Sequence, residues 1–501
     1  MVGSSGISFS GLASGLDTAA IVSQLVALER IPINIARSHQ GEQQSKLDKL
    51  NQFGELVKAL QSKAEDLSTS SGFTKLAIKG QDGDIASISS GSTAIQGTHT
   101  VDILNLSSID RWAFDGVGDD ETDLGTVDGQ TVDFEINGTS YSVSLNADGS
   151  NIEEIATAIN SAAGDDVNAS VVNTGTDASP SYQLVLAAKE SGDDYRISNI
   201  STDLTNLSIT YSAPDVNGDA TSSSNLTVGL NASAEIDGLT ITRSNNDFSD
   251  VLEGISVDAV GVGTTTFTVE PDKAAIRSEV DSFLKSYNDV VKFINTQNTF
   301  TASEEEGEAG ASGELFGDSV LSSVKNAMSR GLFDVDIDII TADTQGYSTL
   351  SNVGITADND GVLSIDDEIF DEKLLGDLDA FTDLFVDSDG FERDPDATPN
   401  TPEYYQDTTA DSGLLATLAR GLDQLFGNLP DDNPDIVVAG IFDLREDTFN
   451  RNIDRIGSDI RDKERRIEDF EENLVLRFAR LEQLMAQLNS QGAALNATLG
   501  G

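Results

Sequence analysis

Apolar residues recur at every seventh position near the C-terminus of this chain. The series comprises Ile453, Ile460, Ile467, Leu474, Leu481, Leu488 and Leu495. Further apolar residues follow three positions on, at Ile456, Phe470 and Leu484. This spacing keeps one stripe of a long helix facing another helix, as in a coiled coil. Polar residues at Lys463, Arg477 and Gln491 interrupt the second row of the repeat, which leaves the seam able to exchange partners.

A matching seam lies near the N-terminus and predicts a helix over 42–70. Its members are Leu50, Phe53, Val57, Leu60, Ala64 and Leu67. A shorter helix is predicted from Asp17 or Thr18, either of which can cap it, and Pro32 interrupts it. Coiled-coil and subunit contacts are therefore expected at Ile21, Leu25, Leu28, Leu50, Val57, Leu60, Ile453, Ile460, Ile467, Leu474, Leu481 and Leu488.

Between the two seams, apolar and polar residues alternate as in β-strands. The first strands are predicted at 84–90 and 98–106. Asn137-Gly138 between two alternating runs predicts a hairpin. A short helix with Ile152, Ile155, Ala156 and Ile159 on one side follows it, and strands at 167–173 and 182–188 complete a predicted ββαββ unit.

The pattern then returns through strands to helices. Strands are predicted at 226–231, 233–243 and 255–270, after an Asp/Ser/Asn-rich linker at 213–225. From Pro271-Asp272 onward a wide apolar stripe predicts a long helix. Further helices are predicted at 315–331, 366–386, 412–427 and 443–490.

This order predicts a multidomain α+β protein in which a terminal coiled-coil and helical-bundle stalk carries two nested, inserted β-rich domains. Nesting keeps both chain ends together in the stalk. The expected domains are a terminal leg of 1–40 and 450–501, a helical bundle of 41–77 and 272–449, a first β-rich domain of 78–110 and 226–271, and a second one of 111–225.

The charge of the chain narrows its partners. The 501 residues include 86 acidic and 30 basic ones, for a formal net charge of −56. Such a surface repels nucleic acid and anionic lipid, and indicates a salt-adapted protein. No stretch is expected to span a membrane, no cleavable secretory signal is apparent, and the absence of cysteine excludes disulfides and thiolate metal sites.

The sequence offers no catalytic or metal-binding pattern. Its two histidines, His39 and His99, lack a neighbouring nucleophile or ligand motif. The acidic segment Thr356–Gly361 fits a calcium loop poorly, because Thr356 stands where the first carboxylate is required, and a hairpin turn explains it better. We therefore expect a protein that is not an enzyme and that holds no cofactor or metal.

Several segments, taken in order, resemble one known family. The segment 10–18 (SGLASGLDT), followed by 21–32 (IVSQLVALERIP), resembles the N-terminal signature of the flagellar hook-associated protein 2 family, the filament cap proteins. The resemblance continues at Ile236–Gly238, at Leu350–Ile355 and at Asp360–Asp366. The segments Ile136–Gly138, Ala158–Asn160 and Val167–Val171 resemble a β module of flagellin-type proteins.

The resemblance implies a structural cap at the distal tip of the bacterial flagellar filament. It implies an annular homo-oligomer of about five copies that helps exported flagellin to fold and insert and prevents it from leaking away. The terminal helices would contact the filament core. Other implied partners are hook–filament junction proteins and a cytoplasmic export chaperone. The implied location is extracellular, after export through the flagellar type III pathway by an uncleaved N-terminal signal.

One alternative function stays open at this point. A tip-exposed adhesin could bind host or surface ligands through the β-rich domains, alongside the cap role or in place of it. A hydrolase would need a cleft with paired carboxylates, and no spacing in the chain supports one.

Overall fold

The computed structural model divides the chain into two compact units. One comprises Met1–Phe73 with Ala275–Gly501, and the other is Thr74–Ala274, so the second unit is inserted into the sequence of the first. The predicted multidomain α+β class is confirmed. The predicted export segment before Asp17 lies outside the described residues, which are 17–124, 127–145, 151–215, 218–301, 311–333, 347–388, 390–399, 401–408, 412–429 and 438–499.

Two helices lead the first unit, α1 (Thr18–Glu29) and α2 (Ile31–Leu67). Asp17 caps α1 by accepting the Ala20 N–H at 3.0 Å, as expected. Arg30 separates the two helices, and Pro32 stands in the first turn of α2, where its missing N–H is not needed. The predicted start of the second helix near residue 42 is therefore wrong. Residues from Ile31 onward are helical because Ile33 and Ala36 pack against the C-terminal helix.

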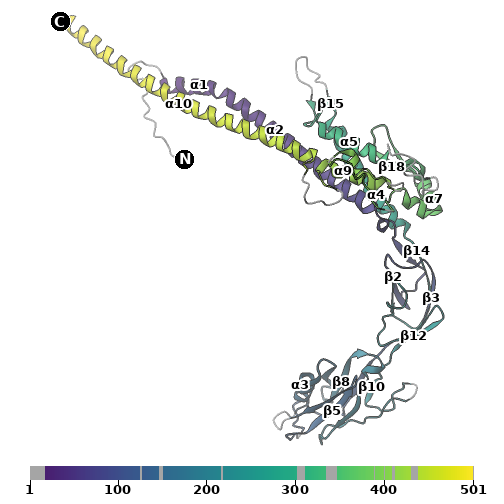
Figure 1. The fold of residues 1–501 in the computed structure, drawn as a ribbon. Helices are drawn as coiled ribbons and strands as arrows, with labels where there is room; N and C mark the ends of the chain where they lie inside the picture. The colour runs from purple at the N-terminus through teal and green to yellow at the C-terminus, as the bar shows by residue number, and fades with distance from the viewer. Residues whose placement is uncertain are drawn as a thin grey trace. The chain divides into compact units, whose positions relative to one another are not determined.

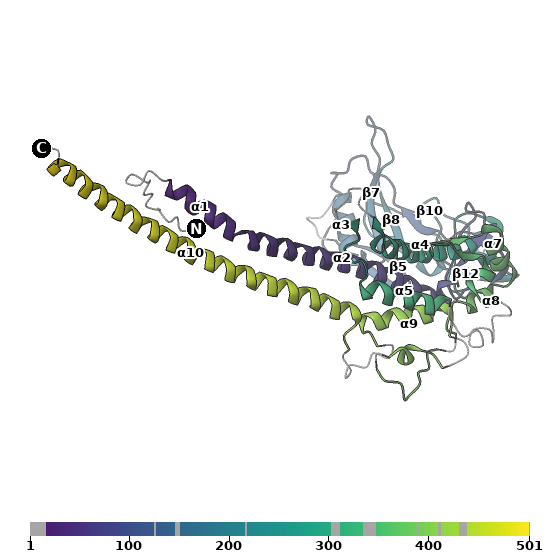
Figure 2. The same ribbon diagram turned by 90° about the horizontal axis from the view of Figure 1, so that it is seen from above.

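The C-terminal helix α10 (Ile441–Leu499) is longer than the predicted 443–490. Its last turns contain alanine, leucine and glutamine, which are good helix formers. Helices α2 and α10 run side by side, and α10 continues past the start of α1 (Figures 1 and 2). Near its start, Phe442 and Phe449 of α10 join the main helical core.

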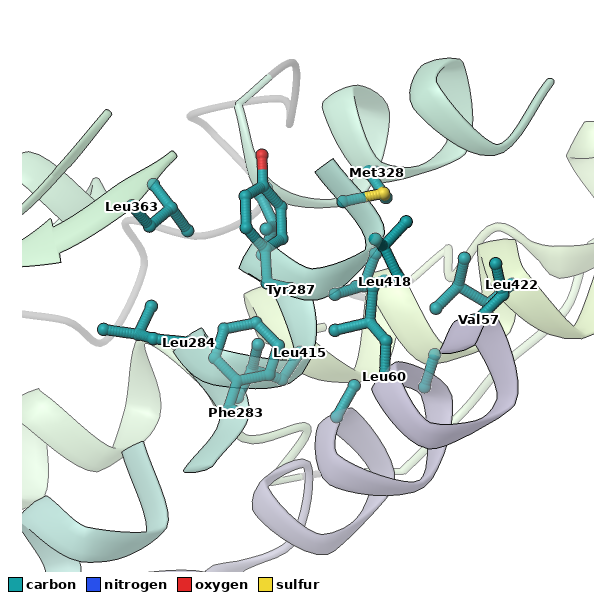
Figure 3. Close-up of a cluster of buried hydrophobic side chains, with 14 of the residues drawn as sticks. Val57, Leu60, Phe283, Leu284, Tyr287, Met328, Leu363, Leu415, Leu418 and Leu422 are labelled. Atoms are coloured by element: carbon teal, nitrogen blue, oxygen red, sulfur yellow. The ribbon is translucent and has the colours of Figure 1, made fainter. Parts of the chain in front are cut away.

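That helical core is built from α2, α4 (Lys273–Gln297), α5 (Ser319–Leu332) and α9 (Leu414–Phe426). Figure 3 shows Val57 and Leu60 of α2 facing Leu418 and Leu422 of α9. The other described elements of the first unit are β15 (Phe300–Thr301), β16 (Ala311–Ser312), β17 (Ile355–Ala357), β18 (Leu363–Ile365), α7 (Asp367–Gly376), α8 (Leu378–Asp383) and the short 3₁₀ helices Ser70–Gly72, Leu350–Val353 and Pro402–Tyr405.

Two sequence predictions in this unit meet different outcomes. The predicted helix 366–386 is broken at Asp377, whose side chain caps α8 by accepting the Ala380 N–H at 3.0 Å. The hairpin predicted in place of a calcium loop is present, as β17 pairs with β18. Asp358 accepts the N–H groups of Asp360 and Val362, both at 2.9 Å, which is how an aspartate stabilises a turn.

In the inserted unit, a five-stranded antiparallel sheet has the order β1-β14-β3-β11-β12, and β2 pairs with β13 beside it. The strands are β1 (Leu76–Lys79), β2 (Ala86–Ser90), β3 (Gly97–Asn105), β11 (Ala232–Ile236), β12 (Leu239–Arg243), β13 (Ile255–Ala259) and β14 (Gly263–Pro271). The predicted strand 233–243 is thus a hairpin. Its turn residues Asp237 and Gly238 have φ angles of 48° and 84°, typical of a type I′ turn. The predicted strand 255–270 is likewise two strands.

The inserted unit has a separate hydrophobic core in which α3 (Ile152–Ala163) packs against two further sheets. The sheets are β6-β5-β9 and β10-β4-β8-β7. Their strands are β4 (Ile109–Ala113), β5 (Thr131–Ile136), β6 (Thr139–Ser144), β7 (Val167–Asn173), β8 (Tyr182–Ser191), β9 (Ser198–Thr202) and β10 (Asn225–Thr227), with a 3₁₀ helix at Asp193–Tyr195. The predicted ββαββ elements are present. However, their two hairpins belong to different sheets, because β5 pairs with β9 and β8 pairs with β4.

One stretch, Thr18–Leu67, passes a length and composition test for a membrane span, with a mean hydropathy of 1.3 over its most apolar window. The expectation that no stretch would do so was wrong, because α1 and α2 follow each other almost without a break. The result is weak evidence for a membrane helix, since the apolar residues Val22, Val26 and Ile33 already pack against α10.

Candidate assembly interface

The helices at the two chain ends are held together by a small apolar cluster. Val22 and Val26 of α1 and Ile33 and Ala36 of α2 pack with Ile460 and Ile467 of α10, and Ile456, Phe470, Leu474 and Phe478 border them. We call this assembly of α1, the first half of α2, and α10 the terminal coil. Its six buried residues make a narrow seam, as expected for a heptad pattern.

The buried face of α1 differs from the predicted one. Thr18, Val22 and Val26 are buried, whereas Ile21 is half-buried and Leu25 and Leu28 are 37% and 62% exposed. The sequence spacing of Val22, Val26 and Ile33 fits one helical stripe, but treating Pro32 as the end of the helical pattern concealed it. The described residues therefore leave the pair Leu25 and Leu28 exposed.

Few polar contacts reinforce the terminal coil. Arg37 and Glu464 form an ion pair between α2 and α10, and the Gln40 side chain donates to the Ile453 carbonyl at 3.4 Å. Both partners of the ion pair are largely exposed, and such pairs contribute little to stability. A narrow apolar seam with weak polar contacts costs little to rearrange.

Three of the predicted contact residues are buried deep in the main helical core. Leu50, Val57 and Leu60 have at most 1% of their surface exposed. They contribute to packing within the chain and offer no side-chain surface to a second subunit or a filament. The expectation of external contacts at these three residues is therefore corrected.

The predicted residues of α10 divide along the helix. Ile460 and Ile467 are buried and Ile453 and Leu474 are half-buried, all against α1 or α2. Farther on, Leu481 and Leu488 are 43% and 52% exposed.

Leu484 and Leu495 are exposed beside them. No charged residue follows Glu482 in the chain. We call Leu481, Leu484, Leu488 and Leu495 the distal apolar row. It continues the heptad seam beyond the part of α10 that α1 and α2 cover.

A second exposed apolar row lies on the opposite chain end. Ile31 and Ile35 of α2 are 49% and 52% exposed and continue the line of Leu25 and Leu28 at helical spacing. The sequence prediction missed Ile31 and Ile35 because it ended the first helix at Pro32. The terminal coil thus presents two apolar rows that its own described residues do not cover.

The contacts of His99 are structural. Nδ1 of His99 lies 2.7 Å from Asp237 in the β11–β12 turn, and Asp237 also accepts the Thr100 N–H at 2.9 Å. Burial alone would raise the pKa of Asp237, but these hydrogen bonds lower it below its usual value. The pair ties a turn to a strand. Among the described residues, no group of acidic, histidine or cysteine side chains could hold a metal ion.

Comparison with known proteins agrees with the pattern of segments. The family model named flagellar hook-associated protein 2 N-terminus matches residues 14–110 of this chain. The family model named flagellar hook-associated protein 2 C-terminus matches residues 229–490. The chain is similar to the B-type flagellar hook-associated protein 2 of Pseudomonas aeruginosa, at 23% identity over 97% of this chain and 93% of that protein. It is also similar to flagellar hook-associated protein 2 of Aeromonas caviae, at 24% identity over 98% of both.

A solved structure shares the fold. The D1-D2-D3 domains of the flagellar cap protein FliD from Escherichia coli superpose with a TM-score of 0.53. The match has 20% sequence identity and covers 80% of this chain and 99% of that one.

Proposed function

The chain belongs to the flagellar hook-associated protein 2 family, and from this premise we propose that it is the structural cap at the distal tip of the flagellar filament. In this role it would promote the folding and insertion of exported flagellin and prevent flagellin from leaking into the medium. Filament elongation and motility would then require it. The name of the similar Escherichia coli structure, a flagellar cap protein, supports this proposal.

The observation that carries the proposal is the distal apolar row. Leu484, Leu488 and Leu495 lie on the stretch of α10 that follows its last charged residue, Glu482, and Leu481 lies just before it, next to a seam of the same spacing. Exposed apolar residues at heptad spacing are suited to packing against other helices. The narrow seam of the terminal coil would allow such contacts to form and break as each flagellin subunit is added.

The proposed partners follow from the cap role. They are further copies of this chain in a ring of about five, flagellin, the hook–filament junction proteins and a cytoplasmic export chaperone. Ile21, Leu25 and Leu28 and the exposed positions of α10 would supply filament contacts. We further propose export through the flagellar type III pathway and the four-part division into leg, bundle and two β-rich domains that the sequence pattern indicates.

An enzymatic role has no support in the family, which is a structural one. The adhesin alternative gains nothing from the comparisons, whose names refer to hook-associated and cap proteins. The cap therefore remains the single function proposed.

The location at the tip can be tested with antibodies raised against the purified protein. Gold-labelled antibody on intact cells, viewed by electron microscopy, should mark the free end of each filament. Antibody absorbed with the purified protein serves as the control. Label along the filament shaft, or only at its cell-proximal end, would contradict the proposal.

A further inference from the structure

A small cavity in the helical unit is lined by polar groups that the fold itself does not use. It has a volume of about 360 Å³ and lies between α4, α5 and the turn that joins β17 to β18. Asn295 of α4 fixes this turn, because its side-chain amide donates to the Asp360 carbonyl at 2.9 Å. All three walls belong to the first unit, so the shape of the cavity does not depend on the inserted one.

The floor of the cavity is apolar. Val291 and Ile294 of α4 and Met328 of α5 line it, and each has at most 9% of its surface exposed. At about 30 Å³ for each water-sized group, the cavity has room for roughly twelve non-hydrogen atoms, the number in one phenylalanine. An apolar hollow of this size with a few polar groups is typical of a ligand site.

The hydroxyl of Tyr287 faces this cavity from α4. The residue is only 5% exposed, and Figure 3 shows its hydroxyl pointing away from Phe283 and Leu415 of the core. Within the described part of the chain, this hydroxyl has no hydrogen-bond partner. Burial raises the pKa of Tyr287 to about 12, so the phenol remains a proton donor at neutral pH. Buried polar groups are nearly always hydrogen-bonded, so this phenol marks a place where a ligand can be held.

A positive charge lies beside the same cavity. Lys325 of α5 is exposed and forms no ion pair with the residues that the structure describes. The carboxylate of Asp358, on the turn, is engaged within that turn, because it accepts the N–H groups of Asp360 and Val362. The cavity therefore combines an apolar floor with a hydroxyl donor and an ammonium donor, and both donors suit an anionic oxygen.

We propose that this cavity binds an apolar amino-acid residue that carries a free carboxylate, such as phenylalanine or leucine. The apolar side chain covers Val291, Ile294 and Met328. The carboxylate accepts the hydrogen of the Tyr287 hydroxyl and lies against the Lys325 ammonium. A free amino acid and the last residue of a polypeptide both have this chemistry. The site is separate from the terminal coil, so the inference does not rest on the cap role.

The test is a titration of the full chain with N-acetyl-L-phenylalanine and, separately, with L-phenylalanine, followed by ligand-observed NMR. The control ligand is N-acetyl-L-phenylalanine amide, which has the same apolar group but no carboxylate. For a ligand of this size we expect a dissociation constant on the order of 1 mM. The acid should bind at least about fivefold more tightly than the amide, because hydrogen bonds to a charged group are the stronger ones. Tighter binding of the free amino acid identifies it as the source, and tighter binding of the acetylated form identifies a polypeptide end.

Two variants test the proposed contacts directly. Tyr287→Phe removes only the hydroxyl and should weaken binding of the acid about tenfold. Lys325→Met should weaken it about threefold, because an exposed ion pair contributes less. The matched control is Tyr347→Phe, whose hydroxyl donates to the Lys373 carbonyl outside the cavity, and its binding should equal that of the wild type. Circular dichroism checks that each variant is folded.

Three results would overturn the proposal. They are no binding of the acid up to about 10 mM, equal binding of the acid and the amide, and equal binding by the wild type and Tyr287→Phe. If Tyr287→Phe does not fold, unchanged binding by Lys325→Met would overturn it instead. None of these results bears on the cap role, which filament length and flagellin in the medium decide.

Discussion

At the scale of single residues, the helical unit contains a buried polar cluster around Arg420. The guanidinium of Arg420 lies 2.7 Å from Asp387 and 3.4 Å from Asp407, and it stacks on the ring of Phe391. Burial raises the pKa of Asp387, although its hydrogen bond with Arg420 acts in the opposite direction. The cluster ties the segment after α8 to α9, so it positions a long connection that has little regular structure.

Replacing Arg420 by methionine should lower the free energy of unfolding by about 3 kcal/mol, because two buried carboxylates would lose their cation. Denaturant unfolding followed by circular dichroism measures the change. The comparison variant is Arg277→Met, whose acidic partners Asp281, Asp367 and Asp371 are exposed. That variant should lose about 1 kcal/mol or less. Equal losses of unfolding free energy in the two variants would show that the buried cluster contributes no more to stability than the exposed one.

Tyr287 gives the core a dependence on alkaline pH. Burial of its phenol raises the pKa of Tyr287 to about 12. Below pH 10 the phenol is neutral in the folded and in the unfolded chain, and its contribution to the free energy of unfolding is fully present. Between pH 10 and 12 the unfolded chain loses the proton while the folded one retains it, so stability falls as the pH rises.

The Tyr287→Phe variant should lack this loss. At pH 11 the wild type should have lost about 1.4 kcal/mol more than the variant, relative to pH 8, since one pKa unit corresponds to that energy. Urea unfolding at the two pH values provides the measurement. Parallel losses in wild type and variant would refute the assignment.

At the scale of elements, the sequence predicted the helices and strands that are marked by a long repeat or by a turn motif within a few residues. The heptad of α10 and the Asn137-Gly138 hairpin were both recognisable, because periodicity and turn chemistry act within a few residues. Strands β4 and β9 were missed, and with them the further pairings of β5 with β9 and of β8 with β4, since pairing between distant strands leaves no local signal. The exposed residues Ile31 and Ile35 were missed because Pro32 suggested a break, whereas proline is tolerated in the first turn of a helix.

The distal apolar row supplies the prediction at this scale. The double variant Leu484→Asp, Leu488→Asp should fold with an unchanged melting temperature, because both side chains are about half exposed. It should nevertheless fail to restore swimming in a strain that lacks the gene, since charges on this row would prevent packing against other helices.

The control is Val172→Asp with Leu239→Asp, at comparably exposed positions of the inserted unit. These substitutions should leave swimming intact. Restoration of normal swimming by the α10 double variant would show that the distal apolar row makes no necessary contact.

At the scale of the whole molecule, the insertion of β-rich structure between two helical ends was predictable from the order of patterns alone. The structure separates the chain into two units, and the finer division into four domains stays a prediction.

The central claim, that this protein caps the filament, is tested most directly by deleting its gene and measuring filament length together with flagellin in the medium. The account predicts short or absent filaments, loss of swimming and abundant monomeric flagellin outside the cells. A plasmid copy of the wild-type gene should reverse all three. Filaments of normal length, with no excess of flagellin in the medium, would contradict the cap function.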